Sequence, residues 1–355
     1  MRARSRAALA LAGVVSASLA GSGRADAFCR TTTCPLPPAW SPTASCQPTS
    51  PFLDSSGVTW PDFATYCAAL MPPAKVLPLW WRNACISYDV QQDPKTGITT
   101  RWASYDQVVQ IADAAFAQWT GATCAGGPVS IQVKNLGPVS CDQVQYNSDQ
   151  ANQHVILFHD DVWPYDTPGT PDSAVSTNTL GLTTVTFDSE SGEIFDADTE
   201  INGTRPLSTS SAADPTAYDL ASIITHEMGH FLGLAHSGDR AATMYALYTQ
   251  GSTMMRTLTA DDVAGICTVY PAGGTRAVDT SVSASGVITA DSCDATPRHG
   301  FSPFCAQPLR RSCAVAGVGA PGAAGGGVAL AAWASIGVAR RRGRRPRSRE
   351  ASTTP

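Results

Sequence analysis

Apolar residues recur every three or four positions between Tyr105 and Trp119, which predicts an amphipathic helix with Ser104 as its N-cap. A second helix is predicted from about Tyr218 to Leu234. A third follows Thr259, because Thr259 and Asp262 stand at capping-box spacing, with Asp in place of the usual Glu. The chain therefore contains three helical segments separated by long non-helical stretches.

Alternating or short apolar runs predict five strands. They are Ala84–Val90, Val129–Val133, His154–Phe158, Leu180–Phe187 and Glu193–Ile201. The polar sequence 188–192 joins the last two and predicts a hairpin. In chain order the elements run β, α, β, β, β, β, α, α, which favours one α+β domain over residues 76–271.

The N-terminus has the composition of a targeting segment. Three Arg residues precede the uncharged apolar stretch 7–20, and Ala25-Asp26-Ala27 fits the small-x-small cleavage rule. Residues 1–27 are therefore predicted to be a secretory signal peptide, and a retained membrane anchor is the alternative. Export would place the chain in an oxidising compartment.

The C-terminal residues 313–355 form a tail of three parts. Cys313 comes first, residues 314–339 carry no charge, and an Arg cluster follows at 340–345. This order predicts a transmembrane segment with the Arg cluster on the cytoplasmic side. It also resembles the MYXO-CTERM type of bacterial sorting signal, which implies processing near Cys313 and delivery to the cell surface, the outer membrane or the medium. An Ala/Gly-rich linker is the alternative.

The net charge of −5 averages over unlike parts. Residues 1–27 hold four basic residues and one acidic residue, and residues 313–355 hold seven and one. Residues 28–312 are left with 13 basic and 27 acidic residues, a net charge of −14. This disfavours nucleic acid or an anionic membrane surface as a partner of the body, so membrane contact is expected only through the tail. We expect a monomer.

Ten of the eleven cysteines remain in the body once Cys313 is set aside, an even number that suits five disulfides. The pair Cys124–Cys141, which flanks a predicted strand, is the one connection we predict. Residues 28–75 are rich in Pro and Cys and are expected to form a stapled N-terminal extension. Residues 272–312 are expected to form a spacer that also contains cysteine.

Three histidines fall within eleven residues, in the sequence His226-Glu227-Met228-Gly229-His230-Phe231-Leu232-Gly233-Leu234-Ala235-His236. On a helix, His226 and His230 project from one face about one turn apart, where both imidazoles can bind one Zn²⁺. Glu227 is placed to reach a water on the metal. Gly233 suits a chain reversal that returns His236 as the third ligand, which leaves a fourth position open. A structural zinc site would need a fourth protein ligand, and none stands nearby in sequence.

This sequence resembles the extended motif of the metzincins. Ser237, which follows the third histidine, resembles the residue found at this position in the matrixins, a group within the metzincins. Met244 resembles the Met-turn, and 261–270 resemble the final matrixin helix. The resemblance implies a metzincin-like zinc protease domain of class α+β, with a twisted mixed β-sheet, an active-site helix and a C-terminal helix after the Met-turn.

Carried over by position, the resemblance implies one catalytic zinc on the three histidines, Glu227 as general base and Met244 beneath the metal. Substrate would pair with the sheet edge at about Leu180–Thr184, with Leu182, Thr183 and Tyr248 in contact. The family usually has Pro where this chain has Ala246. Asp196, Asp198 and Glu200 alternate on one strand and are either Ca²⁺ ligands or a solvated acidic face.

Together these features predict an exported zinc metalloendopeptidase that hydrolyses internal peptide bonds of proteins. Two other functions stay open. One is a catalytically inactive binding or adhesion protein with the same fold, although such a protein would be expected to lack Glu227. The other is a zinc hydrolase acting on a bond other than the peptide bond.

Overall fold

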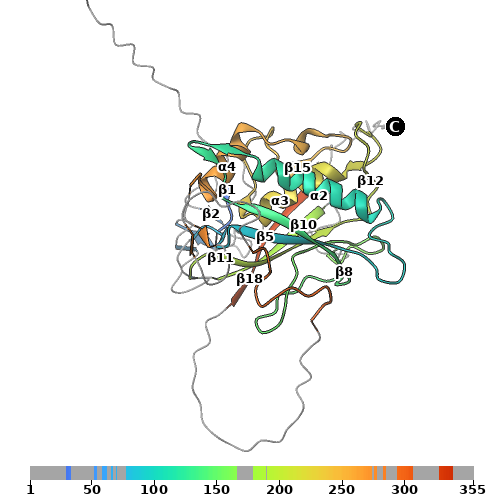
Figure 1. Cartoon of the computed structure of the whole chain (residues 1–355). Helices are drawn as coiled ribbons and strands as arrows, with labels where there is room; N and C mark the ends of the chain where they lie inside the picture. The colour runs from blue at the N-terminus through green and yellow to red at the C-terminus, as the bar shows by residue number, and fades with distance from the viewer. Residues whose placement is uncertain are drawn as a thin grey trace, which may run out of the picture.

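A computed structural model of the chain shows the mixed sheet with helices on it (Figure 1). The described residues are 29–32, 52–53, 58–61, 65–66, 69, 77–165, 179–188, 190–273, 276–277, 283–284, 294–306 and 328–338. The predicted signal peptide and Cys313 lie outside them.

The central sheet has eight strands. They are β4 (Trp80–Trp81), β5 (Cys85–Gln91), β8 (Gln132–Val139), β9 (Val155–Phe158), β10 (Thr179–Asp188), β11 (Glu193–Ile201), β15 (Leu247–Tyr248) and β18 (Val328–Val338). Their order is β15-β18-β10-β11-β9-β5-β8, and β4 also pairs with β11. Strands β8, β5, β9 and β11 are parallel, whereas β10 is antiparallel to β11 and β18. The predicted mixed sheet and the β10–β11 hairpin are confirmed.

One predicted strand is displaced. Strand β8 begins at Gln132 and not at Val129, because the N–H of Val129 donates to Ala122 O at 3.2 Å in a turn. Val129 and Ile131 are nevertheless buried in the core, at 3% and 1% exposure. The apolar run therefore marked core residues correctly but did not show where strand pairing starts.

The helices are α2 (Tyr105–Thr120), α3 (Leu220–Phe231) and α4 (Ala260–Val269), with a 3-10 turn η1 (Met254–Arg256). Helices α2 and α3 lie on the same side of the sheet (Figure 1). Ser104 caps α2 through a capping box with Gln107, as its sequence position predicts. The indole of Trp119 on α2 donates to Thr225 O of α3 at 2.9 Å, which fixes the two helices against each other.

Helix α3 is shorter than predicted, and its end is strongly constrained. Asp219 is the N-cap of the helix, and Tyr218 and Asp219 form a short strand before it, so the helix begins at Leu220. At the other end Gly233 has a φ of +91°, which L side chains rarely adopt, and a Cβ there would lie 2.8 Å from Leu79 O. The Trp81 indole donates to Phe231 O at 2.7 Å and the Tyr270 hydroxyl to Leu232 O at 2.9 Å. The chain reversal after α3 is therefore held from both sides.

The remaining strands are two-residue pairs. They are β1 (Cys29–Arg30) with β14 (Leu234–Ala235), β2 (Phe52–Leu53) with β3 (Thr59–Trp60), β6 (Thr123–Cys124) with β7 (Gly127–Pro128), β12 (Leu207–Ser208) with β13 (Tyr218–Asp219), and β16 (Arg276–Ala277) with β17 (Ser283–Ala284). Through the β1–β14 pair, residues expected in an N-terminal extension contact the segment that follows α3.

The predicted disulfide Cys124–Cys141 is wrong. Cys124 bonds to Cys267 and Cys141 to Cys305, and Cys85 is also disulfide-bonded. The first bridge ties β6 to α4. The second ties the end of β8 to residues 294–306, which belong to the expected spacer. Pairs 143 and 164 residues apart meet only because the tertiary fold brings them together, so strand proximity could not reveal them.

The apolar tail differs from its prediction in the part that is described. Among the described residues, no helix has both the length and the apolar composition needed to cross a membrane. Within the apolar run 314–339, residues Val328–Val338 form strand β18, whose backbone pairs with β10 and β15. The N–H and C=O groups of its backbone pair with the neighbouring strands, so they do not need a helix to be hydrogen-bonded.

Candidate active site

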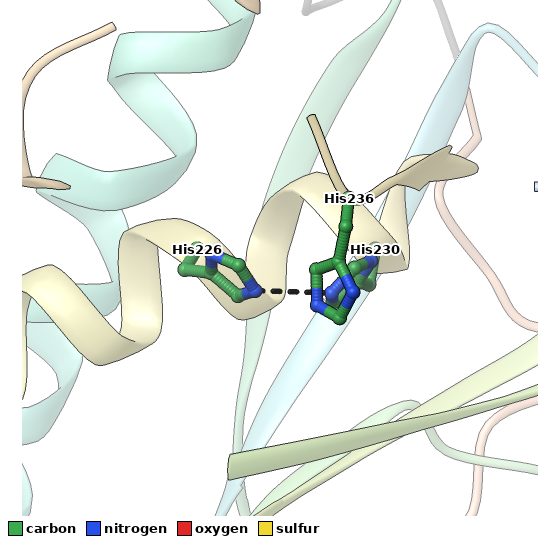
Figure 2. Close-up of side chains that lie close together, drawn as sticks. All are labelled: His226, His230 and His236. Atoms are coloured by element: carbon green, nitrogen blue, oxygen red, sulfur yellow. Dashed lines mark hydrogen bonds between the residues drawn. The ribbon is translucent and has the colours of Figure 1, made fainter. Parts of the chain in front are cut away.

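The three motif histidines converge on one point (Figure 2). His226 and His230 come from consecutive turns of α3, and His236 comes from the chain after β14. One ring nitrogen of each lies within 4.8 Å of the others, and Nε2 of His226 is 3.1 Å from Nε2 of His230. The reversal at Gly233 makes the third histidine reach the other two.

Backbone carbonyls fix the imidazole tautomers. His226 Nδ1 donates to Thr243 O at 2.7 Å, and His230 Nδ1 donates to Leu234 O at 2.8 Å. Burial, followed by the charge of His236, lowers the pKa of His226 to about 3. Burial, followed by His226 and His236, holds the pKa of His230 well below its usual value. Both rings are therefore neutral at physiological pH, with the Nε2 lone pairs pointing into the site.

This donor set fits a zinc ion. Two Nε2 lone pairs 3.1 Å apart cannot hydrogen-bond to each other when both Nδ1 atoms carry the protons, so a cation between them is what relieves their repulsion. Three imidazoles, two of them neutral and held by backbone carbonyls, are a ligand set typical of catalytic zinc. The residues His226, His230 and His236 would hold the metal.

Glu227 lies on α3 against strand β10, which is paired on both sides by β11 and β18. Its Oε2 accepts a hydrogen bond from Thr183 Oγ1 at 2.8 Å, and the side chain is fully buried. A Cβ on Gly181 would lie 2.6 Å from Glu227 Oε1, so only glycine allows the strand to pass this close to the carboxylate. The strand therefore orients the carboxylate beside the histidines.

Met244 packs under the histidine pair, at 2% exposure. A Cβ added to Gly229, which lies between the two helical histidines, would come within 2.2 Å of Met244 Sδ. The structure thus places Met244 directly against the turn of α3 that carries His226 and His230. This is the position expected for a hydrophobic floor under the site.

Asp262 anchors the Met-turn, a role that its sequence position did not reveal. Its Oδ2 accepts hydrogen bonds from Thr243 N at 2.9 Å and from Thr259 N and Oγ1 at 2.8 Å each, and its Oδ1 accepts from Met244 N at 3.1 Å. The spacing predicted the cap of α4. The same carboxylate also holds Thr243, whose carbonyl orients His226. The sequence offered one hint of this role: Asp262 is a charged residue in the first turn of a helix whose other predicted contacts are with the core.

The residues predicted to contact substrate lie around the site, but their side chains point inward. Leu182 and Thr183 on β10 are fully buried, and the Thr183 hydroxyl lies 3.0 Å from Thr199 Oγ1 as well as bonding to Glu227. Tyr248 is 1% exposed, and its hydroxyl accepts from Asp219 N at 3.1 Å. Thr183 is thus placed to position Glu227, and Tyr248 supports the fold of the segment 247–249.

The acidic residues of β11 are buried, so their interpretation as a solvated face is wrong. Asp198 accepts from Gln145 N and Val155 N at 2.8 Å each. Glu200 lies 2.7 Å from His159 Nε2 and accepts from the Tyr165 hydroxyl at 2.6 Å. Protein groups therefore already bind the carboxylates of these two residues. Calcium binding at Asp196, Asp198 and Glu200 stays a prediction.

His154 and Asp89 complete this buried cluster beside the sheet. His154 packs on Trp81, with ring centroids 4.9 Å apart, and its Nε2 lies 3.7 Å from Asp196 Oδ1. Burial lowers the pKa of His154 to about 4, and burial raises the pKa of Asp89 to about 7 although His154 N donates to it. Near neutral pH Asp89 is therefore close to its pKa, so a small change in pH changes the charge of the cluster.

Replacing Asp89 by asparagine is expected to change how stability depends on pH. The unfolded Asp89 releases its proton near pH 4 and the folded one near pH 7, so the wild type loses stability as pH rises through this window. Asp89→Asn should therefore gain stability relative to the wild type by roughly 1.4 kcal/mol per pH unit, levelling off above about pH 7. Denaturant unfolding between pH 5 and 8 measures this, with exposed Asp142→Asn as control. A difference that does not vary with pH would contradict it.

Comparisons with known proteins agree with this geometry. Human matrix metalloproteinase-26 is 34% identical over 140 residues, which cover 38% of this chain and 46% of that protein. Metalloendoproteinase 1-MMP of Arabidopsis thaliana is 27% identical over 200 residues, covering 54% of this chain and 44% of that protein. Human neutrophil collagenase is 45% identical over 53 residues, 15% of this chain and 11% of that protein. The chain thus spans less than half the length of these curated relatives.

The matrixin family, Peptidase_M10, matches residues 80–271, which is more than half of the chain. The matched region runs from β4 through α4 and contains the three histidines, Glu227, Met244 and the Asp262 anchor. Membership of this family implies a catalytic zinc, which the donor set of the site fits. The chain therefore belongs to the matrixin family of metalloproteases.

Proposed function

We propose that the chain is a zinc-dependent endopeptidase that hydrolyses internal peptide bonds of protein substrates. The observation that carries this proposal is the convergence of three imidazoles beside a buried carboxylate that strand β10 holds in place. A nucleophilic Ser or Cys is not needed for such chemistry. The names of the relatives, a matrix metalloproteinase and a collagenase among them, support the same reaction class.

Each side chain has a separate task. The three histidines would hold a zinc ion, which would supply Lewis acidity and lower the pKa of the attacking water. Glu227 accepts the proton of the attacking water and later delivers it to the departing amine. Thr183 keeps Oε2 of Glu227 in place through its 2.8 Å hydrogen bond. The carbonyls of Thr243 and Leu234 keep the two helical imidazoles in the tautomer that presents Nε2.

We further propose that the protein acts outside the cytoplasm, at the cell surface or after release. The disulfides Cys124–Cys267 and Cys141–Cys305 support an oxidising compartment. The signal-peptide pattern of residues 1–27 and the Cys313–apolar–Arg order of the tail support export and sorting. Calcium at the acidic strand β11 is a separate proposal. It would show as a calcium-dependent rise in melting temperature.

Removing the metal tests the function. The purified full chain is expected to contain about one zinc per chain by elemental analysis and to cleave casein at a measurable basal rate. A chelator should abolish cleavage, and added Zn²⁺ should restore it. His236→Ala should lose both zinc and cleavage. His299→Ala changes an exposed histidine outside the site and should lose neither.

Two outcomes would contradict the proposal. Cleavage that persists when zinc is absent would show that another group carries the reaction. Bound zinc with no cleavage of casein, gelatin or peptide libraries would favour the inactive binding protein with this fold.

A further inference from the structure

Strand β18 comes from the far end of the chain and lies along the outer edge of β10 (Figure 1). The two strands are antiparallel over their whole length, from Thr179 opposite Gly337 to Asp188 opposite Val328. On its other side, β18 runs parallel to β15, with Leu247 opposite Gly337 and Tyr248 opposite Val338. The strand therefore takes the position in the sheet between β10 and β15, which we call the groove.

This groove passes directly over the candidate active site. Gly181 of β10, where a Cβ would lie 2.6 Å from Glu227 Oε1, is opposite Ile336, and Thr183, which bonds to Glu227, is opposite Ala334. Strand β18 also contacts α3, which carries Glu227 and two of the histidines. The backbone between Ala334 and Gly337 is therefore the part of β18 that lies opposite the residues of β10 next to Glu227.

Most of the site is buried in the presence of this strand, although His236 is partly exposed. His226 and Glu227 are fully buried, and His230 is 1% exposed. A protein substrate would have to bring a peptide bond to these groups. It would also need the main-chain donors and acceptors on the edge of β10, which β18 already uses. Strand addition to a sheet edge derives its affinity from these main-chain hydrogen bonds, so two strands compete for one edge.

The sequence of β18 allows it to pair with β10 as an extended strand along its whole length. Its eleven residues, Val-Ala-Leu-Ala-Ala-Trp-Ala-Ser-Ile-Gly-Val, include no charge and no proline, so every residue can pair through its backbone. A connection of 21 residues joins it to the described segment 294–306. A segment tethered in this way has an effective concentration on the order of a millimolar, which exceeds that of most free substrates.

We propose that residues 328–338 are a built-in occupant of the substrate groove, which holds the full chain at a low basal activity until the tail is displaced. This proposal rests on the endopeptidase function proposed above, because the groove it assigns to the tail is that of the same site. The occupant is a segment of this chain bound as an extended strand. Displacement of the tail would open the edge of β10 to a protein substrate.

Hydrogen exchange tests the occupancy without reference to catalysis. Two prolines, introduced by Ala334→Pro with Ser335→Pro, remove one N–H on each side of the strand, because successive N–H groups along a strand point in opposite directions. Placed in the full chain with Glu227→Gln, they should make exchange at least about tenfold faster in the peptide that covers β10 and leave β11 unchanged. The control carries two prolines outside β18, by Ala323→Pro with Ala324→Pro. Equal protection of β10 in both variants would overturn the proposal.

Activity then tests the latency. With Glu227 present, the variant with prolines in β18 should cleave a casein peptide with kcat/KM at least about tenfold higher than the control. A synthetic peptide of sequence 328–338 should inhibit it competitively. Faster exchange of β10 without any gain in cleavage over an active control would overturn the latency. If neither zinc-loaded variant cleaves at all, the proposed function fails, whereas the exchange result still decides whether the tail occupies the groove.

Discussion

Glu227→Gln is expected to lower kcat/KM for protein cleavage by about 10²- to 10⁴-fold while zinc remains bound. Glutamine keeps the size of the side chain and can still accept the hydrogen bond from Thr183 Oγ1. It cannot take a proton from the attacking water. The three histidines that would hold the metal are untouched, so loss of activity should separate from loss of metal. Kinetic assays on a quenched peptide and elemental analysis of the same sample measure both quantities.

The matched control is Glu190→Gln, which changes an exposed glutamate in the β10–β11 turn by the same chemistry. It should leave cleavage and zinc content at wild-type values. Unchanged cleavage in Glu227→Gln would refute the general-base role. Loss of zinc in Glu227→Gln would show that this carboxylate supports the metal site and not the proton transfer alone.

Asp262→Ala should have the largest effect on the structure of the site. It removes the acceptor of four hydrogen bonds and leaves buried N–H groups of Thr243 and Met244 without a partner. Such a loss costs roughly 1–3 kcal/mol for each buried group, so unfolding should become easier by several kcal/mol. Because Thr243 O orients His226, zinc affinity should also fall by about 10- to 100-fold. Denaturant unfolding and zinc competition titration measure the two effects.

Asp106→Asn serves as the control, because Asp106 is a first-turn aspartate of α2 that is exposed. It should change stability and zinc affinity little. Asp262→Asn keeps one oxygen acceptor and should fall between the wild type and the alanine variant in both measurements. Normal zinc affinity in Asp262→Ala would show that the Met-turn keeps its place without this anchor.

Features that depend on neighbouring residues in the chain could be predicted. The helix at 105–120, the β10–β11 hairpin and the zinc-binding motif each depend on periods of a few residues, because side-chain direction repeats along a helix or strand. The spacing of His226 and His230 therefore carries their shared helix face, and Gly233 marks the reversal that returns His236. The family resemblance adds the roles of Glu227 and Met244.

Features that depend on residues far apart in the chain needed the fold. The pairing of Cys124 with Cys267, and the second function of Asp262 beyond its helix cap, depend on where α4 lies against β6 and against the Met-turn. The acids of β11 alternate in sequence as a solvated face would, yet the sheet buries them against β9 and the segment near Gln145. Alternation records which side of a strand a residue takes. It does not record whether that side is covered.

The tail shows most clearly the difference between features that local sequence determines and features that the tertiary fold determines. Its composition specifies a long uncharged apolar segment, and such a segment can be satisfied by a bilayer, a linker or a sheet edge. The choice of β10 and β15 as neighbours for residues 328–338 depends on an unpaired edge elsewhere in the molecule. Local spacing in the sequence thus determines the chemistry of the histidine site. Only the tertiary structure decides what covers that site, because long-range pairing depends on which backbone edges the fold leaves open.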